Sequence, residues 1–348
     1  MHINLKMKSQ DFYKNCEQCP RKCKIDRTSG KLGFCQESDR LKIAFAGLHF
    51  GEEPLVTVFG GSGTIFFTGC TLRCSFCQNY QISQNGMGKI ITTEEFSQIC
   101  LKLQNAGAEN INLVTPSHQI LLIKEGIEKA KNLGVKIPFC WNSSAYESVE
   151  MLEMLKDLVT IWLPDLKTLN KNLSKQVFIA PDYPEVATKA ILWMMKNSPL
   201  QIEEIPCPPN EKIVEWSEKG TPRKKITSGV IIRHLFLPGK FEETAEVLSW
   251  LKENADKKAI ISLMNQYTPV KFDEDEKKLQ IRKKSLSAIE NRLVNAQEFE
   301  DIYDLLEAFD FENLFYQELT DDTSWLPDFS KNQPFSNKLA TPLWHWKN

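Results

Sequence analysis

The sequence lacks several features that would assign it at once to a broad class of protein. It has no run of the roughly 18 to 20 apolar residues that a bilayer-spanning helix needs. Basic charge is not in excess, since 43 Lys and Arg residues stand against 45 Asp and Glu residues, which argues against a broadly basic nucleic-acid-binding protein. Met1 to Lys14 are too polar for the core of a signal peptide. We therefore expect a cytoplasmic enzyme or binding protein, with neither a membrane nor a nucleic acid as partner.

Cysteine is too sparse for a secreted domain held by disulfides, since the 348 residues contain ten cysteines. Seven of the ten fall into two groups, which indicates two metal sites rather than disulfide pairs. The N-terminal thiol group is Cys16, Cys19, Cys23 and Cys35, the second group is Cys70, Cys74 and Cys77, and the scattered remainder are Cys100, Cys140 and Cys207. We expect Cys100 and Cys140 to be small buried apolar residues.

From residue 60 onward, short β-rich runs alternate with segments of helical spacing, and this alternation repeats about six times. Such alternation predicts parallel strands joined by right-handed helical crossovers, with the chemistry at the carboxyl ends of the strands. The expected strands are Thr64 to Thr68, Ile111 to Thr115, Ile137 to Asn142, Thr160 to Leu166, Gly229 to Leu237 and Ala259 to Met264.

Helical spacing is found between and after these strands. The expected helices are Thr92 to Asn105, Leu121 to Leu133, Ser148 to Leu158 and a helical stretch from Arg292 to Leu319. The charged tract Asp273 to Lys284 is typical of a solvated helix face. The tail from Trp325 is rich in aromatic residues, and we expect it to pack back onto the body of the protein.

Length alone suggests two domains, although an α/β barrel with appendages can occupy the whole chain. We predict three regions: a cysteine-rich N-terminal extension over 1–58, a barrel over 59–272 with an insertion at 202–227, and a helical C-terminal region over 273–348.

The most informative stretch is the loop after the first predicted strand, TIFFTGCTLRCSFCQNYQI. Cys74 and Cys77 are three residues apart, so one helical turn can present both to the same point, and Cys70 can reach that point from the loop. Three thiolates can hold three irons of a 4Fe–4S cluster and leave the fourth iron open to another ligand. Zinc is a weaker interpretation, because a structural zinc needs a fourth protein ligand.

The spacing C-x3-C-x2-C, with aromatic Phe76 before the last cysteine, resembles the radical S-adenosylmethionine (SAM) superfamily. This resemblance implies a partial (β/α)6 TIM-type barrel with the cysteine loop after its first strand. It also implies that SAM chelates the open iron, that an electron from the cluster cleaves SAM, and that a 5′-deoxyadenosyl radical then abstracts hydrogen from a substrate.

A closer resemblance covers most of the chain and concerns the pyruvate formate-lyase activating enzyme-like iron–sulfur proteins. The strings that carry it include GSGTIFFTGCTLRCSFCQNYQIS, INLVTPSHQ, LPDLK, IIRHLFLPG and SLMNQYTP, with NCEQCPRKCKIDRTSGKLGFC and WLPDFSKNQPF outside the barrel. True activating enzymes are oxidoreductases that abstract hydrogen from a glycine of a partner protein. The alternatives are the same chemistry on a small molecule, and an iron–sulfur electron carrier or redox sensor without turnover. Either enzymatic alternative implies an electron donor of the flavodoxin or ferredoxin type.

The residues expected to bind SAM lie at the ends of the predicted strands, apart from Phe76 in the cysteine loop. They are Phe76, Ser117, Asn142, Asp165, Lys167 and Arg233. The superfamily usually carries a Gly-Gly-Glu-like segment after its second strand to receive the methionyl amino group, and this chain has Thr115-Pro116-Ser117-His118 there. Ser117, a backbone carbonyl or His118 are the candidates for that contact, and a purely structural His118 is the alternative.

Polar side chains at the other strand ends have functional and structural interpretations of their own. Asn142 can bind a carboxylate or ribose, or belong to a helix N-cap. Asp165 and Lys167 match the Asp-x-Lys segment of activating enzymes, or form a structural ion pair. Arg233 is expected to bind an anion such as the methionyl carboxylate, or to form an internal salt bridge. Tyr267 can line the same cavity or belong to the core.

Two further features complete the candidate sites. The N-terminal thiol group can close a four-thiolate site that holds either a second 4Fe–4S cluster or a zinc ion, in a segment too poor in apolar residues to form its own core. His49, Glu52 and Glu53 place an imidazole and two carboxylates together, and either bind substrate or form a turn. The sequence assigns no catalytic residue.

Overall fold

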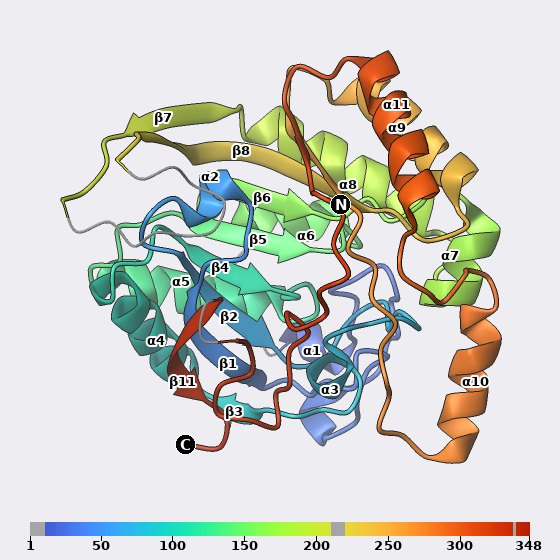
Figure 1. Ribbon diagram of the computed structural model, residues 1–348. Helices are drawn as coiled ribbons and strands as arrows, with labels where there is room; N and C mark the ends of the chain where they lie inside the picture. The colour runs from blue at the N-terminus through green and yellow to red at the C-terminus, as the bar shows by residue number, and fades with distance from the viewer. Residues whose placement is uncertain (1–10, 210–219, 337–338) are drawn as a thin grey trace.

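A curved, mostly parallel sheet organises the protein. The computed structural model describes residues 11–209, 220–336 and 339–348. Its strands are β1 (Leu41–His49), β2 (Ser62–Phe67), β3 (Lys89–Ile91), β4 (Ile111–Val114), β5 (Phe139–Ser143), β6 (Ile161–Pro164), β7 (Gln201–Ile205), β8 (Arg223–Leu235), β9 (Ile260–Met264), β10 (Leu314–Tyr316) and β11 (Ala340–His345). They lie in the order β10-β9-β8-β6-β5-β4-β2-β1-β11, with β3 paired to β1 and β7 to β8 (Figure 1).

The predicted α/β fold is confirmed. The six predicted strands correspond to β2, β4, β5, β6, β8 and β9, and neighbours among them pair in parallel. Every residue of β4 and β6 is buried, as expected of parallel strands covered on both faces. The strand order is open, running from β10 to β11, which agrees with a partial barrel.

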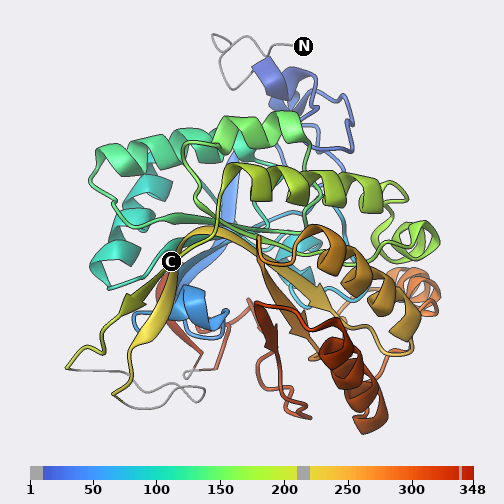
Figure 2. The same ribbon diagram turned by 90° about the horizontal axis from the view of Figure 1, so that it is seen from above.

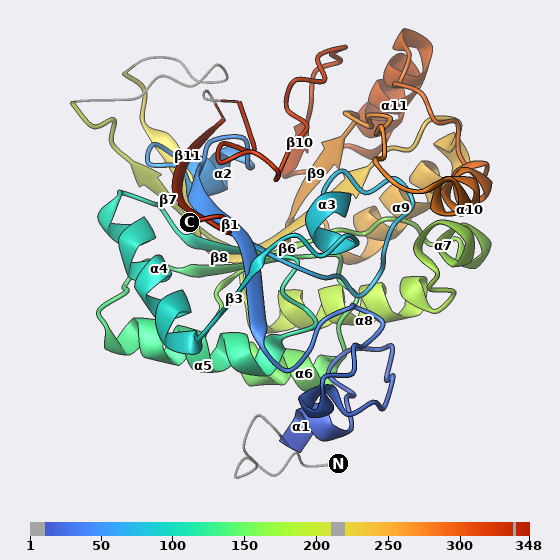
Figure 3. The same ribbon diagram turned by 90° about the horizontal axis from the view of Figure 1, so that it is seen from below.

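Helices cover the outer face of this sheet. The longer ones are α4 (Thr93–Asn105), α5 (Ile120–Asn132), α7 (Lys171–Phe178), α8 (Tyr183–Asn197), α9 (Phe241–Asn254), α10 (Glu276–Leu286) and α11 (Ala296–Phe309). The short ones are α1 (Asp11–Lys14), η1 (Arg27–Ser29), α2 (Pro54–Thr57), α3 (Tyr80–Ser83), α6 (Val149–Leu152) and η2 (Glu153–Leu155). Figure 3 shows α4, α5 and α8 along the outside of the sheet. The predicted start at Thr92 is a capping box, in which Thr92 and Glu95 satisfy each other's backbone N–H groups.

Two predicted helices are wrong in part. Only α6 and the single turn η2 form within Ser148 to Leu158. The stretch from Arg292 to Leu319 contains α11 but then turns into β10, which pairs in parallel with β9. A three-residue strand has little pattern of its own, and its pairing depends on a distant neighbour.

A strand from the N-terminal part of the chain, β1, and one from the C-terminal part, β11, join the sheet. The strand β1 lies within the predicted extension 1–58 and pairs with β2. The predicted packing of the tail is confirmed, since Phe329 and Phe335 are buried and β11 pairs antiparallel with β1. The division into three regions stays a prediction.

The predicted insertion at 202–227 contains β7 and the first part of β8, and residues 210–219 lie outside the described residues. Strand β7 pairs antiparallel with β8, and Figure 2 shows this arm extending from one corner of the body. Within the described ranges, we find no helix with the length and apolar content that crossing a membrane requires.

Candidate functional site

The three-cysteine loop, residues 68–79, connects β2 to α3 at the carboxyl end of the parallel strands. Cys74 is buried, and Cys70 and Cys77 are half-buried. The backbone N–H of Leu72 donates to Sγ of Cys70 at 3.4 Å, and Oγ of Ser83 lies 3.3 Å from Sγ of Cys77. Burial raises the pKa of Cys77, and the hydrogen bond with Ser83 opposes that shift.

The three thiols also affect one another electrostatically. Burial raises the pKa of Cys74, Lys167 opposes this shift, and Cys70 and Cys77 add to it. A metal centre would remove the cost of crowding these thiols, because it takes the place of their protons. Within the described residues, no three His, Cys, Asp or Glu side chains could hold a single metal ion. A 4Fe–4S cluster is a different ligand, because each thiolate binds a different iron, and three thiols with no fourth nearby fit such a cluster with one open iron.

A buried ion pair holds the middle of this loop. Nη1 of Arg282 donates to the carbonyl of Ser75 at 2.9 Å, and the same guanidinium contacts Glu274 at 2.6 Å and Gln84 at 3.1 Å. Arg282 is 8% exposed although α10 is otherwise mostly solvated, so the predicted solvated face has one side chain turned inward. The position of the three thiols therefore depends on a helix 200 residues further along the chain.

Four of the predicted site residues meet at the ends of β5, β6 and β8. Nε of Arg233 donates to Oδ1 of Asp165 at 2.9 Å, and Nζ of Lys167 lies 2.7 Å from Oδ2 of Asp165. Arg233 also donates to the side-chain carbonyl of Asn142. Burial alone would raise the pKa of Asp165, but Arg233 and Lys167 together hold it below its usual value. Asp165 is thus an ionised carboxylate shared by two cations.

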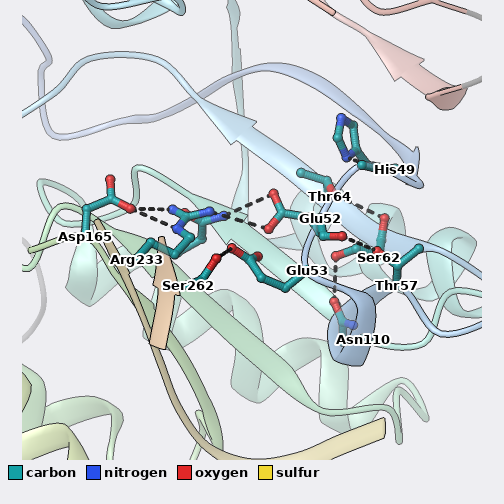
Figure 4. A network of polar contacts seen from close by, with 12 residues as sticks. His49, Glu52, Glu53, Thr57, Ser62, Thr64, Asn110, Asp165, Arg233 and Ser262 are labelled. Carbon is teal, nitrogen blue, oxygen red and sulfur yellow. Dashed lines mark hydrogen bonds and ion pairs between the residues drawn. The ribbon is translucent and has the colours of Figure 1, made fainter. Parts of the chain in front are cut away.

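Two carboxylates from the segment after β1 reach into the same network (Figure 4). Glu52 lies 3.5 Å from Nη1 of Arg233, and Oγ of Ser262 donates to Oε1 of Glu53 at 3.3 Å. Burial raises the pKa of Glu53 to about 7, Arg233 opposes the shift and Glu52 adds to it. Burial lowers the pKa of His49 to about 4, so this imidazole is neutral. Oε2 of Glu53 has no hydrogen-bond partner among the described residues.

A further carboxylate, that of Glu147, lies near the end of β4, and the sequence analysis does not predict it. The hydroxyl of Ser117 and Nε1 of Trp141, the latter at 3.3 Å, both donate to Oε1 of Glu147. Glu147 is 2% exposed, and its Oε2 has no hydrogen-bond partner in the described parts of the chain. Burial raises the pKa of Glu147, and its hydrogen bonds oppose that shift. Its only signal in the sequence is an acidic residue shortly after a buried strand.

Phe76 packs against other aromatic rings, and His118 is hydrogen-bonded to the backbone of the three-cysteine loop. The ring of Phe76 packs edge-on against Phe178 and Tyr267, with centroids 6.0 and 5.7 Å apart. Tyr267 is itself buried, and its hydroxyl donates to Asn291 at 2.6 Å. Nε2 of His118 donates to the carbonyl of Thr68 at 2.7 Å, and burial lowers the pKa of His118 to about 3. The neutral His118 therefore holds the first residue of the three-cysteine loop, Thr68, through a buried hydrogen bond.

The N-terminal thiol group lies against the three-cysteine loop. Cys16, Cys19 and Cys35 are buried and Cys23 is half-buried. A Cβ added at Gly33 would lie 3.2 Å from Sγ of Cys35 and 3.5 Å from Sγ of Cys23, so these two sulfurs flank one point. Cys100 and Cys140 are buried, as predicted.

Comparison with known proteins finds similarity to a family model over part of the chain. Residues 64–200 match the model of the radical SAM superfamily. An uncharacterized protein of Methanocaldococcus jannaschii is 28% identical over 281 residues, which are 77% of this chain and 70% of that protein.

Two solved structures are also similar. SuiB of Streptococcus suis, bound to S-adenosylmethionine, has a TM-score of 0.43 and 14% identity over 72% of this chain, which spans 45% of the length of SuiB. A radical SAM methyltransferase from Sphaerobacter thermophilus has a TM-score of 0.42 and 13% identity, over 74% of this chain and 66% of that protein. The family match covers residues 64–200, which include the three-cysteine loop and strands β4, β5 and β6.

Proposed function

We propose that this protein is a radical SAM enzyme whose 4Fe–4S cluster is held by Cys70, Cys74 and Cys77. When bound, the cluster supplies the electron that cleaves SAM to methionine and a 5′-deoxyadenosyl radical, which abstracts hydrogen from the substrate. The observation that carries the proposal is that the loop with the three thiols follows β2 at the carboxyl ends of the parallel strands. Asp165 and Lys167, which follow β6, are close enough to Cys74 to act on it electrostatically. The radical SAM family match covers this whole region.

The ends of β4 and β5 offer a partner for the methionyl amino group. Glu147 is a buried carboxylate with one oxygen occupied by Ser117 and the other without a hydrogen-bond partner among the described residues. A buried carboxylate needs a cation or a donor, and an ammonium group supplies both. We therefore assign the amino contact to the pair Ser117 and Glu147, in place of the Gly-Gly-Glu segment that this chain lacks.

Lys167 is the better candidate for the methionyl carboxylate. Arg233 already contacts Asp165, Asn142 and Glu52, so much of its charge and hydrogen-bonding capacity is used inside the protein. The ammonium of Lys167 has three donors, and Asp165 accepts one of them. In this arrangement Arg233 fixes Asp165, and Asp165 in turn orients Lys167.

We propose a glycine of a partner protein as the hydrogen donor, on the strength of the resemblance to activating enzymes, and a flavodoxin or ferredoxin type protein as electron donor. A small molecule is the second candidate. The observation that favours it is the interior carboxylate Glu53, whose Oε2 has no hydrogen-bond partner among the described residues. A small substrate with a hydroxyl or ammonium group would satisfy this oxygen.

The first experiment is anaerobic reconstitution with iron and sulfide, followed by reduction with dithionite and SAM and chromatography of 5′-deoxyadenosine. We expect product from the wild type and from Cys100→Ala, a buried thiol outside both groups, and none from Cys74→Ala. A loaded and reducible cluster that never cleaves SAM would contradict the proposal and favour an electron carrier. A glycyl radical signal on an added partner would select the protein substrate over the small molecule.

A further inference from the structure

Each part of the N-terminal thiol group is held in place by the backbone. The N–H of Cys16 donates to the carbonyl of Ile25 at 3.0 Å, and its own carbonyl accepts from Lys24 at 3.0 Å. The N–H of Lys22 donates to the carbonyl of Cys19 at 3.0 Å. Cys16, Cys23 and Cys35 lie close enough to Cys19 to act on it electrostatically, and Cys16 acts on Cys35 in the same way. Four thiols are thus gathered in a segment that builds little apolar core.

A buried cation lies beside these thiols without a full counter-charge. Arg27 is 1% exposed, and its nitrogens contact Sγ of Cys16 at 3.6 Å, the carbonyl of His118 at 2.9 Å and the carbonyl of Ser38. Its Nε has no hydrogen-bond partner among the described residues.

The carboxylate of Glu37 lies near Arg27 but forms its ion pair with another cation, Lys42, at 3.9 Å. A buried guanidinium needs an anion, and a four-thiolate metal centre carries a net negative charge. The charge on Arg27 therefore points to a filled metal site beside it.

The same segment is in contact with the three-cysteine loop. Nε of Arg21, which lies between Cys19 and Cys23, donates to the carbonyl of Thr71 at 2.8 Å. Gly69 has a φ of +87°, and a Cβ there would lie 2.8 Å from the carbonyl of Cys35. Backbone from the segments that carry the two thiol groups thus packs directly together.

We propose that Cys16, Cys19, Cys23 and Cys35 ligate a second 4Fe–4S cluster that relays single electrons to the cluster of the three-cysteine loop. A low-potential donor of the flavodoxin or ferredoxin class reduces the N-terminal cluster by one electron, and this electron then passes to the cluster of the three-cysteine loop. No bond forms or breaks in this transfer. A zinc ion could not change its oxidation state, and no three His, Cys, Asp or Glu side chains of the described residues are placed to hold a single ion. The relay, but not the presence of the N-terminal cluster, rests on the proposed function.

The test uses the full chain with Cys70→Ala, Cys74→Ala and Cys77→Ala combined, which removes the first site and leaves the N-terminal group intact. After anaerobic reconstitution we expect about four iron and four sulfide per chain. Reduction should give a paramagnetic signal that SAM does not alter. One zinc per chain, or no metal at all, would overturn the proposal. Failure of the wild type to cleave SAM, with this cluster still present, would instead count against the proposed function alone.

The relay has its own test in Cys19→Ala and in Cys23→Ser, which keep the three-cysteine loop. With a reduced flavodoxin or ferredoxin as donor, formation of 5′-deoxyadenosine should fall at least tenfold. With dithionite, a small reductant that can reach the first cluster directly, formation should stay within about twofold of wild type. Equal loss with both reductants, in variants that still load the first cluster, would assign the N-terminal site a structural role and overturn the relay.

Discussion

Glu147 and Ser117 form a buried pair across two strand ends, in which the hydroxyl donates to one carboxylate oxygen and the other oxygen has no hydrogen-bond partner within the described chain. The two residues are 30 positions apart in the sequence and come from segments after β5 and β4. This geometry supplies a buried carboxyl group at the strand end where the chain has no acidic motif.

Glu147→Gln should weaken the binding of SAM without loss of iron. The amide keeps the size of the side chain and can accept from Ser117, but it no longer attracts an ammonium group. We expect the Kd for SAM to rise about tenfold, measured by equilibrium dialysis on the reconstituted protein. Glu153→Gln is the matched control, because Glu153 also accepts from an indole N–H, that of Trp193, but is exposed. Equal affinities for wild type and Glu147→Gln would remove Glu147 from the SAM site.

Arg233→Gln should destabilise the fold strongly. It leaves Glu52 without its cation and Asp165 with Lys167 alone, and loss of one partner from a buried ion pair typically costs about 3–5 kcal/mol. Arg233→Lys should cost less, since the charge is kept and only the planar fork is lost. Anaerobic urea denaturation measures both values. Breaking the exposed pair of Lys171 and Glu185 by Lys171→Gln should cost less than about 1 kcal/mol, and a similar cost for Arg233→Gln would contradict the network.

The stability of the protein should depend on pH through Glu53. Burial raises the pKa of this carboxyl from 4.5 to about 7. Between these values the folded protein holds a proton that the unfolded chain has released, so this contribution to stability falls as the pH rises through that window. Glu53→Gln, which cannot ionise, should remove roughly 1–3 kcal/mol of this dependence.

Urea denaturation of both proteins at about pH 5 and about pH 8 makes the comparison. Glu307→Gln serves as the control, because Glu307 is exposed on α11. Parallel pH profiles for wild type and Glu53→Gln would mean that Glu53 is ionised in the folded protein at all these pH values.

Arg282→Met should loosen the three-cysteine loop. The substitution removes the donor to the carbonyl of Ser75 and leaves Glu274 unpaired. A loop that opens more often should release iron to a chelator about tenfold faster, which corresponds to a loss of about 1.4 kcal/mol in local stability. Lys283→Met changes an exposed neighbour on α10 and should leave the rate unchanged. If both variants release iron equally, Arg282 does not hold the loop.

The parallel strands could be predicted because each is a short apolar run followed by a helical pattern, as at Ile111–Val114 before α5. The strand β10 could not be predicted, because it has three residues and forms only through its pairing with β9, which is distant in the sequence. The cysteine loop and the polar residues Asn142, Asp165, Lys167 and Arg233 could be located for a similar reason, since parallel strands bring their carboxyl ends together. Their roles in binding stay predictions.

Other parts of the site depend on contacts between distant segments. Glu52 meets Arg233, 181 positions away, and Arg282 meets Ser75, 207 positions away. No local pattern marks either contact, because the partners are set by how the sheet curves and where α10 returns. Glu147 could not be predicted for the same reason, although Asn142, at the end of the strand before it, was a predicted site residue.

The antiparallel pairing of β11 with β1 has a consequence for how the protein is made. During synthesis β1 leaves the ribosome early, and β11 emerges after every other described strand. The part of β1 from Phe45 to His49, with which β11 pairs, therefore stays uncovered on that edge through nearly the whole of translation. A chain that stops short of Ala340 would present β1 as an open edge to other nascent chains, with aggregation as the expected fate.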